Sequence, residues 1–345
     1  MQSRMAFIEI LAPKLLDAVR RTAAFGDTSA LDMARILLPA DRIAGDGLDF
    51  EEAVLALFGM SDDAGYAPAL AGVTAAYDFD LDQVPVDLLR ADPVFLRPDP
   101  SRLILFDAET IGLDGAEADT LIALLNRSFE SDGLRFRRGR SATRWYVNAS
   151  DVTETRTRSP RSLRGQAIEP QLNDVRRIGR FNRVMTEAQM VLHEADVNAA
   201  REAAGKQPIN SLWFWGLGKP PVRTAPRTRL VVGDELVAAC ARYCDVEYHL
   251  NLDLAGAGEF DGGGLTIVCE LDTETSTLDA FLREAFQPAL TALAAHRVDA
   301  IRIRTQSDTF LLTRRTPWWV WRRFRSLDSI LQDNLDAVAS DGGAS

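Results

Sequence analysis

The sequence predicts a protein of the α/β (α+β) class, in which small, mostly antiparallel sheets pack against helices. Short apolar segments of strand length alternate along the chain with longer segments that have helical periodicity. Hydrophobic residues make up 46% and charged residues 26% of the 345 positions, which is typical of a globular protein with a full core. This length predicts two domains, or three small ones.

The first 90 residues are expected to form a helical N-terminal region. Charges are mixed among the apolar residues of the first segment, and no small-residue cleavage site follows it. We therefore expect a mature helix there rather than a signal peptide. The expected helices cover residues 6–24, 29–38, 50–59 and 67–76, the third with Asp49 at its N-cap.

Residues 91–222 are expected to form a second domain, an α/β module that begins strand, strand, helix, strand, strand. The Pro-Asp-Pro sequence at 98–100 predicts a tight connection between the first two strands. A polar loop, a helix and an apolar strand follow. The expected strands are 94–97, 103–106, 134–138, 144–147 and 209–215, and the expected helices are 116–129, capped by Asp114, and 171–194.

Residues 223–345 are expected to form a C-terminal α/β region that ends in a Trp/Arg-rich segment at 317–325. A glycine-rich stretch at 255–264 precedes one of its strands. The expected strands are 228–232, 265–270, 299–304 and 309–313, and the expected helices are 234–243, 277–295 and 325–338.

Charge and cysteine content restrict the function. The net charge of −11 disfavours general nucleic-acid binding, although residues 135–230 carry an excess of bases. That basic part either presents an anion-binding face or docks against the acidic parts. Three cysteines are too few for a disulfide framework, so we expect a cytoplasmic protein. No apolar run is long enough to span a membrane.

The usual catalytic motifs are not found in the sequence. It has no Walker A pattern, no Gly-x-Gly-x-x-Gly between a strand and a helix, and no Gly-x-Ser-x-Gly elbow. Asp245 and His249 lie in a strand-like segment, where residues four apart are about 13 Å from each other. Cys240 and Cys244 have no second pair to complete a zinc site. We therefore predict no catalytic residue, no metal ligand and no cofactor.

Five arginines surround one predicted strand pair. Arg135 and Arg137 share a face of a strand and can line an anion-binding surface, because guanidinium groups fit phosphate and carboxylate oxygens. The alternative is a solvated sheet face without a ligand. The remaining members of the group are Arg138, Arg140 and Arg144.

The segment 182–221 combines polar helical residues with an aromatic strand and a glycine-flanked turn, which is a candidate ligand site. In the alternative interpretation, Asn198 and Asn210 tie the helix to the strand and the tryptophans belong to the core. The predicted ligand-binding residues are Gln189, His193, Asn198, Arg201, Asn210, Trp213, Trp215, Gly216 and Gly218. A small anion or a protein partner is the expected occupant.

The same segment carries a family resemblance. The sequence HEADVNAAREAAGKQPINSLWFWGLGKPP resembles the RpfE-type bacterial regulatory proteins, also described as phosphoglycerate mutase-related. That family is similar in turn to the insertion domain of archaeal-type, cofactor-independent phosphoglycerate mutases. Trp215 stands where those mutases have an arginine. The matching positions are Val197, Asn198, Arg201, Pro208, Asn210, Gly216 and Gly218.

The resemblance also implies what is missing. The mutases belong to the alkaline-phosphatase superfamily, whose chemistry uses a Ser or Thr nucleophile and two metal ions held by Asp and His residues. The chain has only three scattered histidines and no Asp-Gly strand opening at its N-terminus, so this site cannot be built from its residues. We therefore expect a non-catalytic regulatory protein that binds a ligand or a partner. The alternatives are an active metal-dependent phosphomutase or phosphatase, and a protein-interaction scaffold.

Overall fold

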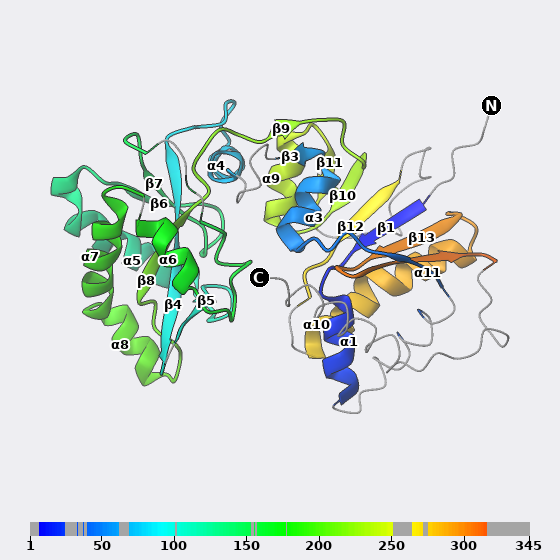
Figure 1. Cartoon of the computed structure of the whole chain (residues 1–345), viewed down its shortest axis with the longest axis horizontal. Helices are drawn as coiled ribbons and strands as arrows, with labels where there is room; N and C mark the ends of the chain where they lie inside the picture. Colours follow the sequence, from blue (N-terminus) through cyan, green and yellow to red (C-terminus); the bar gives the residue numbers. More distant parts are fainter. Residues whose placement is uncertain are drawn as a thin grey trace. The chain divides into compact units, whose positions relative to one another are not determined.

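The chain folds into two compact units (Figure 1). Unit 1 comprises residues 1–59 and 224–345, and unit 2 comprises residues 60–223. The first border thus lies 31 residues before the expected one at 90/91. In this computed structural model the described residues are 7–24, 33, 37, 40–61, 69–100, 102–152, 155, 157–176, 178–250, 264–271 and 275–315.

Unit 1 contains a seven-stranded sheet in the order β11-β10-β12-β1-β13-β14-β2. The four pairings from β11 to β13 are parallel, and the two that join β14 and β2 are antiparallel. The α/β class is confirmed, although this sheet is mainly parallel rather than antiparallel. The strands are β1 (Phe7–Leu11), β2 (Asp41–Ala44), β10 (Leu230–Val232), β11 (Glu247–His249), β12 (Leu265–Val268), β13 (Ala300–Arg304) and β14 (Asp308–Thr313).

The expectation of a helix over residues 6–24 was wrong in its first part. Strand β1 comes first, and helix α1 (Leu15–Ala24) begins only after Pro13. Ile8 and Ile10 are fully buried in the core between the neighbouring strands, which accounts for their apolar character. The expectation of a purely helical N-terminal region was therefore wrong, because this region also contains strands β1 and β2.

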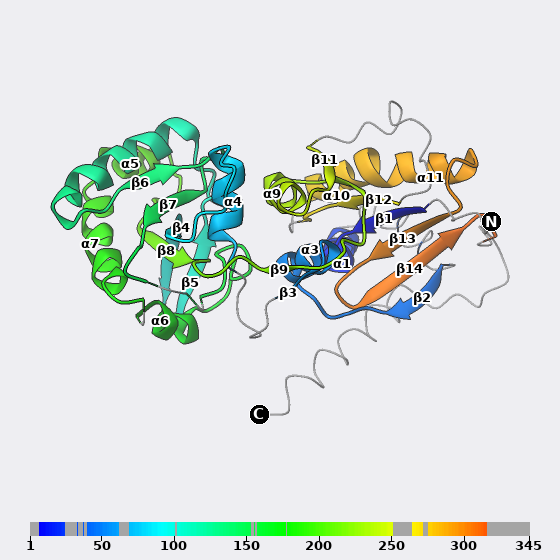
Figure 2. The same ribbon diagram turned by 90° about the horizontal axis from the view of Figure 1, so that it is seen from above.

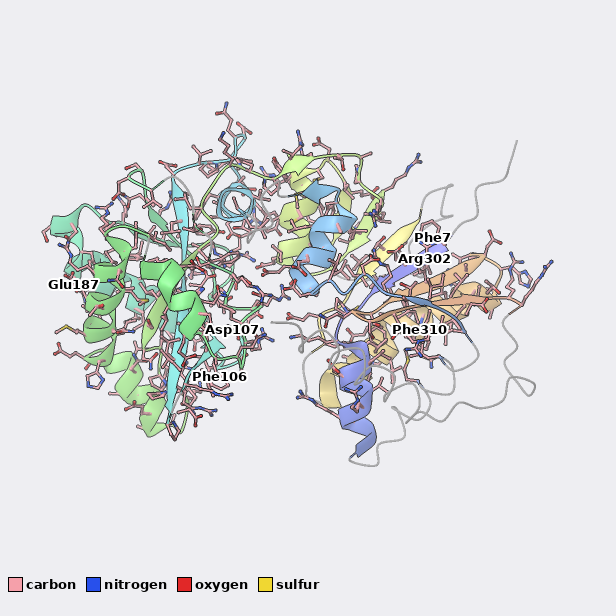
Figure 3. The ribbon with its side chains drawn as sticks, viewed as in Figure 1. Phe7, Phe106, Asp107, Glu187, Arg302 and Phe310 are labelled. Atoms are coloured by element: carbon pink, nitrogen blue, oxygen red, sulfur yellow. The ribbon has the colours of Figure 1, made fainter. Side chains whose placement is uncertain are left out.

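The charged residue Glu9 can occupy the central strand β1 because two arginines of β13 pair with it. Its carboxylate accepts hydrogen bonds from Arg302 and Arg304 of β13, each at 3.1 Å. Arg302 also lies over the ring of Phe7, 5.3 Å from its centroid, as the labelled side chains of Figure 3 allow the reader to follow. Because the arginines are far along the chain, periodicity alone could not distinguish this strand from a helix.

One face of the unit 1 sheet is covered by helices that share its main hydrophobic core. This core joins β1, β12 and β13 to α1, α10 and α11. A short π-helical turn at Leu282–Phe286 divides the single helix expected at 277–295 into two. The helices of unit 1 are α1, α3 (Phe50–Leu57, with the predicted Asp49 cap confirmed), α9 (Glu235–Tyr243), α10 (Thr275–Phe281) and α11 (Gln287–Ala294).

Unit 2 is built on an antiparallel sheet in the order β5-β4-β7-β6, with β8 also paired to β4. The expected strand pairs are confirmed. Strands β3 (Met60–Ser61) and β9 (Val222–Arg223) form a separate small pair. The main strands are β4 (Leu88–Asp99), β5 (Arg102–Asp107), β6 (Phe136–Arg138), β7 (Trp145–Asn148) and β8 (Ser211–Trp215).

Helices α4 and α7 lie on opposite faces of this sheet (Figure 2). On the α7 side, Phe181 packs against Phe214 of β8, with ring centroids 5.0 Å apart. The single helix expected at 171–194 is two helices separated by Gly179, which has φ +51°. The helices are α4 (Ala71–Asp78), α5 (Gly115–Ser128, with the predicted Asp114 capping box confirmed), α6 (Glu169–Arg176), α7 (Phe181–His193) and α8 (Asp196–Ala203).

Some sequence features lie outside the described residues. They are most of the expected helix 29–38, most of the glycine-rich stretch 255–264, the Trp/Arg-rich segment 317–325 and the last expected helix 325–338. Within the part of the chain that the structure describes, no helix is long and apolar enough to cross a membrane.

None of the three cysteines of unit 1 forms a disulfide; Cys240 is buried, and Cys244 and Cys269 are partly exposed. Burial raises the pKa of Cys269 to about 12 and also raises the pKa of Cys240, so both remain protonated near neutral pH. A shift of three units corresponds to a roughly thousandfold smaller thiolate population. We expect the partly exposed Cys244 to react first with iodoacetamide at pH 8, as peptide mapping by mass spectrometry will test.

The urea-unfolded protein is the control for this labelling, because all three thiols should then react at similar rates. A rate for Cys269 in the folded protein that equals its unfolded rate at pH 8 would contradict the prediction.

The raised pKa of Cys269 also makes the free energy of unfolding depend on pH. Since the unfolded chain loses its proton first, the free energy of unfolding should fall as the pH rises above about 9.

Candidate functional site

Asn198 of α8 lies at the centre of the predicted ligand segment, and it is buried. Its amide nitrogen donates hydrogen bonds to the carbonyls of Leu192 and Ile209, at 2.7 and 2.6 Å. Its amide oxygen accepts the Ile209 N–H at 2.8 Å. The two bonds with Ile209 join α8 to the segment just before β8, and the bond to Leu192 joins α8 to α7. These are the contacts of a structural tie between helix and strand.

Arg201, one turn further along α8, is only 2% exposed and fully engaged. Its guanidinium forms an ion pair with Glu117 of α5 at 2.5 Å. It also donates to the carbonyls of Ile111, Gly112 and Gln207. The charge is thus used inside unit 2, where it holds α8 to the start of α5.

The other predicted site residues do not converge on Asn198 and Arg201. Asn210 forms two hydrogen bonds with the backbone of Leu96 on β4, at 2.8 and 2.9 Å. His193 is exposed at the end of α7. The remaining members are Gln189, which donates to Ser211; Trp213, which donates to the Arg158 carbonyl; Gly216, with φ +76°; and Gly218, with φ +155°.

Trp215 belongs to a different group, a buried cluster under α4 that we call the Arg90 cluster: Arg90, Asp92, Trp215, Tyr146, Asp78 and Arg144. Arg90 forms a two-pronged ion pair with Asp92, at 2.9 and 2.7 Å. The indole N–H of Trp215 donates to the same carboxylate at 2.7 Å. The Arg90 guanidinium lies 4.8 Å from the Trp215 ring centroid and 5.4 Å from that of Tyr146.

A second ion pair completes the Arg90 cluster. Arg144 binds Asp78 through two hydrogen bonds of 2.9 and 2.6 Å, and the Tyr146 hydroxyl donates to Asp78 at 2.6 Å. Gly139 is required for this approach, since a Cβ there would lie 2.0 Å from the Asp78 carboxylate. The cluster contains two arginines and two aspartates, so its formal charge is balanced.

Burial governs the acid–base behaviour of this cluster. Desolvation raises the pKa of Asp92 despite the opposing effects of Arg90 and the hydrogen bonds from Trp215 and Trp145. Desolvation is also the main cause that raises the pKa of Tyr146. A buried hydrogen-bonded carboxylate depends strongly on its partner, because an unpaired charge in this position is costly.

The sequence carries one signal for this cluster, in strand β4. Arg90 and Asp92 are two apart inside the otherwise apolar strand sequence LLRADPVFL, so they must lie on one face. Charges within such a strand are almost never fully buried unless they are paired. The partners Trp215 and Tyr146 come from distant strands, however, and no local pattern identifies them.

The segment that follows β1 in unit 1 begins without an acidic side chain. Ala12 and Pro13 stand there; Ala12 is fully buried and donates its N–H to the Arg304 carbonyl at 2.8 Å. The Pro13 carbonyl accepts the Gln306 N–H at 3.1 Å. This end of the strand is therefore apolar and bonded to the turn between β13 and β14.

The histidines lie on separate elements of the structure. His249 is exposed on β11, 3.6 Å from Glu247, and His296 has φ +61° after α11. Asp245 precedes the strand rather than sharing a helix with His249. Among the residues described, no three His, Cys, Asp or Glu side chains form a group that could hold a metal ion.

Comparison with known proteins gives partial matches to one class of enzyme. The chain is 31% identical over 110 residues to the 2,3-bisphosphoglycerate-independent phosphoglycerate mutase of Methanosarcina mazei, a match covering 32% of this chain and 28% of that protein. A probable mutase of the same kind from Geobacter sulfurreducens is 27% identical over 170 residues, covering 48% and 42%. The matches thus span less than half of the curated relatives. No protein-family model matches the chain.

Among solved structures, a cofactor-independent phosphoglycerate mutase from Thermoplasma acidophilum is 13% identical, with a TM-score of 0.41 over 97% of this chain and 100% of that one. A Pyrococcus horikoshii protein is 14% identical, with a TM-score of 0.47 over 95% and 92%. Over part of its length, the chain is therefore similar in sequence to 2,3-bisphosphoglycerate-independent phosphoglycerate mutases.

Proposed function

We propose that the chain is a non-catalytic relative of the cofactor-independent phosphoglycerate mutases, with a regulatory role in the cytoplasm, and that it binds a small anionic ligand or a protein partner. The regulatory role follows from the resemblance to the RpfE-type proteins. The partial similarity to mutases supports the ancestry. The tryptophan at position 215 supports the second part of the proposal, that this chain has lost the phosphate chemistry of the mutases.

The state of Trp215 is the observation on which this proposal depends. By the resemblance, this position holds an arginine in the mutases. Here the Trp215 residue is 3% exposed, and its indole N–H donates a hydrogen bond to the Asp92 carboxylate. The nearby Arg90 cannot replace the missing charge, because Asp92 already engages it through two hydrogen bonds. A phosphate arriving at this point would have to break a buried ion pair.

The end of β1 supports the same proposal. A metal-assisted phosphoryl transfer needs oxygen ligands that hold the ion at the reacting atoms. Ala12 and Pro13 provide no side-chain oxygen at this position, and their backbone groups are engaged with β13 and the following turn.

A metal-dependent phosphomutase is the second candidate, and the sequence similarity to four curated mutases favours it. The two functions differ in turnover. We expect the purified full-length chain, supplied with Mn²⁺, to form no 2-phosphoglycerate from 3-phosphoglycerate in an assay coupled to enolase. The Methanosarcina mazei mutase, assayed in parallel, is the positive control.

Metal-dependent turnover by this chain would overturn the non-catalytic function. Elemental analysis of the purified protein provides a second measurement, since a mutase-like site should retain divalent metal. A metabolite screen by thermal shift separates a ligand-binding protein from a scaffold. If no anionic compound raises the melting temperature, a scaffold that contacts only proteins replaces the ligand-binding function.

A further inference from the structure

The decapeptide 135–144 contains five arginines and no acidic residue, and the structure divides these arginines into two sets. Three of them have a carboxylate partner. Within the described part of the chain, the other two have no carboxylate partner. The paired set consists of Arg138 with Asp119, Arg140 with Asp80, and Arg144 with Asp78.

Arg135 and Arg137 form the second set. Exposure alternates along this segment, because both arginines are exposed while Phe136 between them is buried. Their side chains therefore lie on the same open face at β6, an edge strand of the unit 2 sheet. Among the described residues, neither guanidinium contacts a carboxylate.

Phe79 positions one of these groups. The Arg137 guanidinium lies 4.2 Å from the centroid of the Phe79 ring. A guanidinium that stacks on an aromatic ring through its flat face keeps its N–H edges available as donors. An exposed arginine that is held in this way needs less ordering to bind a ligand than one that moves freely.

The neighbours of the pair do not neutralise its charge. Tyr146 is opposite Arg137 in the strand pairing, and Asn148 accepts the Arg135 backbone N–H at 2.8 Å. Both side chains are neutral. Asp80, next to Phe79 in the sequence, is engaged by Arg140 through hydrogen bonds of 2.7 and 2.8 Å. Two positive charges therefore remain on one face.

We propose that Arg135 and Arg137 bind the phosphoryl group of a small phosphate ester. The proposal rests on the ligand-binding function given above and locates its anion site on this strand rather than in the segment 182–221. Residues two apart in a strand are about 7 Å from each other, so two long side chains can converge on one anion. A dianionic phosphoryl group has enough oxygens to accept from both forks.

Isothermal titration of the full-length chain tests the site, with 3-phosphoglycerate and inorganic phosphate as ligands and glycerate as the control without phosphate. We expect both phosphorylated probes to bind and glycerate not to bind. The double variant R135Q/R137Q should weaken binding at least tenfold. Circular dichroism should show an unchanged fold, because both side chains are exposed.

The matched control is R97Q/R102Q. Arg97 also stacks on a phenylalanine, Phe106, at 4.9 Å, and Arg102 is exposed on the adjacent strand β5. There Asp99 is opposite Arg102, so a carboxylate accompanies the two charges. This variant removes the same net charge from the same unit, and we expect it to change phosphate affinity less than twofold.

Phe79 gives an independent test of the geometry. Its replacement in F79L keeps every charge and removes the ring that lies beneath Arg137 and that also packs against Tyr146, with ring centroids 5.2 Å apart. Exposed cation–π contacts are weak, so we expect a loss of affinity of about two- to fivefold. An unchanged affinity would show that the stacked arrangement has no part in binding.

The site is overturned if the wild-type chain binds neither phosphorylated probe, if R135Q/R137Q binds as tightly as the wild type, or if the control variant loses as much. A labelled single-stranded oligonucleotide that binds more tightly than 3-phosphoglycerate, and is lost in R135Q/R137Q, would assign the face to nucleic acid instead. Turnover in the enolase-coupled assay refutes the non-catalytic function separately. Unchanged binding in R135Q/R137Q refutes only this site.

Discussion

Replacing Asp92 by asparagine is expected to lower the free energy of unfolding by about 3–5 kcal/mol, because Arg90 then remains buried without its counter-charge. Both side chains of the pair are less than 10% exposed. Trp215 and the Trp145 backbone would also lose a charged acceptor. Urea denaturation of D92N and the wild type, followed by circular dichroism, measures the difference.

The exposed pair Arg138–Asp119 is the matched control. The geometry of this pair is similar to that of Arg90 and Asp92, with hydrogen bonds of 2.6 and 3.1 Å. The hydrogen bond from Arg138 lowers the pKa of Asp119. The Asp119 side chain is 60% exposed, however, and exposed pairs contribute about 0–1 kcal/mol. D119N should therefore change stability little. Equal losses for D119N and D92N would contradict the importance of burial.

The double variant R90M/D92N extends the test. Removing both charges eliminates the uncompensated arginine, so the combined loss should be smaller than the sum of the two single losses by about 0.5–3 kcal/mol. An additive result would mean that Arg90 and Asp92 are stabilised independently of each other.

The second large effect is expected for Arg201. Replacement by methionine should destabilise the protein by about 3–5 kcal/mol, since it removes a charged side chain that is only 1% exposed and leaves Glu117 without its counter-charge and three part-buried carbonyls without this donor. Lysine should not restore the loss, because a single ammonium cannot reproduce the planar fork. Denaturant unfolding of R201M and R201K gives both values.

The exposed Arg183 of α7 is the control for Arg201. Its side chain is 63% exposed and pairs with Asp132 and Glu187 at the surface. R183Q should change the free energy of unfolding by less than about 1 kcal/mol. A variant R201M that kept wild-type stability but lost binding of an anionic ligand would restore Arg201 as a ligand residue.

Much of the local structure of unit 2 could be predicted from the sequence. Asp114 and Glu117 specify the start of α5 within four residues, because the capping box is formed by neighbours in the chain. The Pro98-Asp99-Pro100 sequence likewise marks the connection between β4 and β5. Such features depend on contacts within a few residues, so their residue types alone are informative.

Strand β1 shows where this reasoning failed. Its charged residue Glu9 resembles the polar face of a helix until Arg302, 293 positions later, is placed beside it. The pairing of β1 between β12 and β13 decides the strand, and both neighbours come from the far end of the chain. A window of 20 residues contains neither of them.

The candidate site divides in the same way. The sequence by itself determined the residue types of the segment 182–221, its resemblance to a mutase insertion domain, and the arginine-rich segment 135–144. Only the tertiary structure decided how their charges are used. Trp215 and its hydrogen-bond partner Asp92 are 123 positions apart in the sequence, so the fold alone separates engaged groups from available ones. The fold engages Asn198 and Arg201 in hydrogen bonds inside unit 2. It leaves Arg135 and Arg137 exposed, because among the described residues it brings acidic partners to Arg138, Arg140 and Arg144 instead.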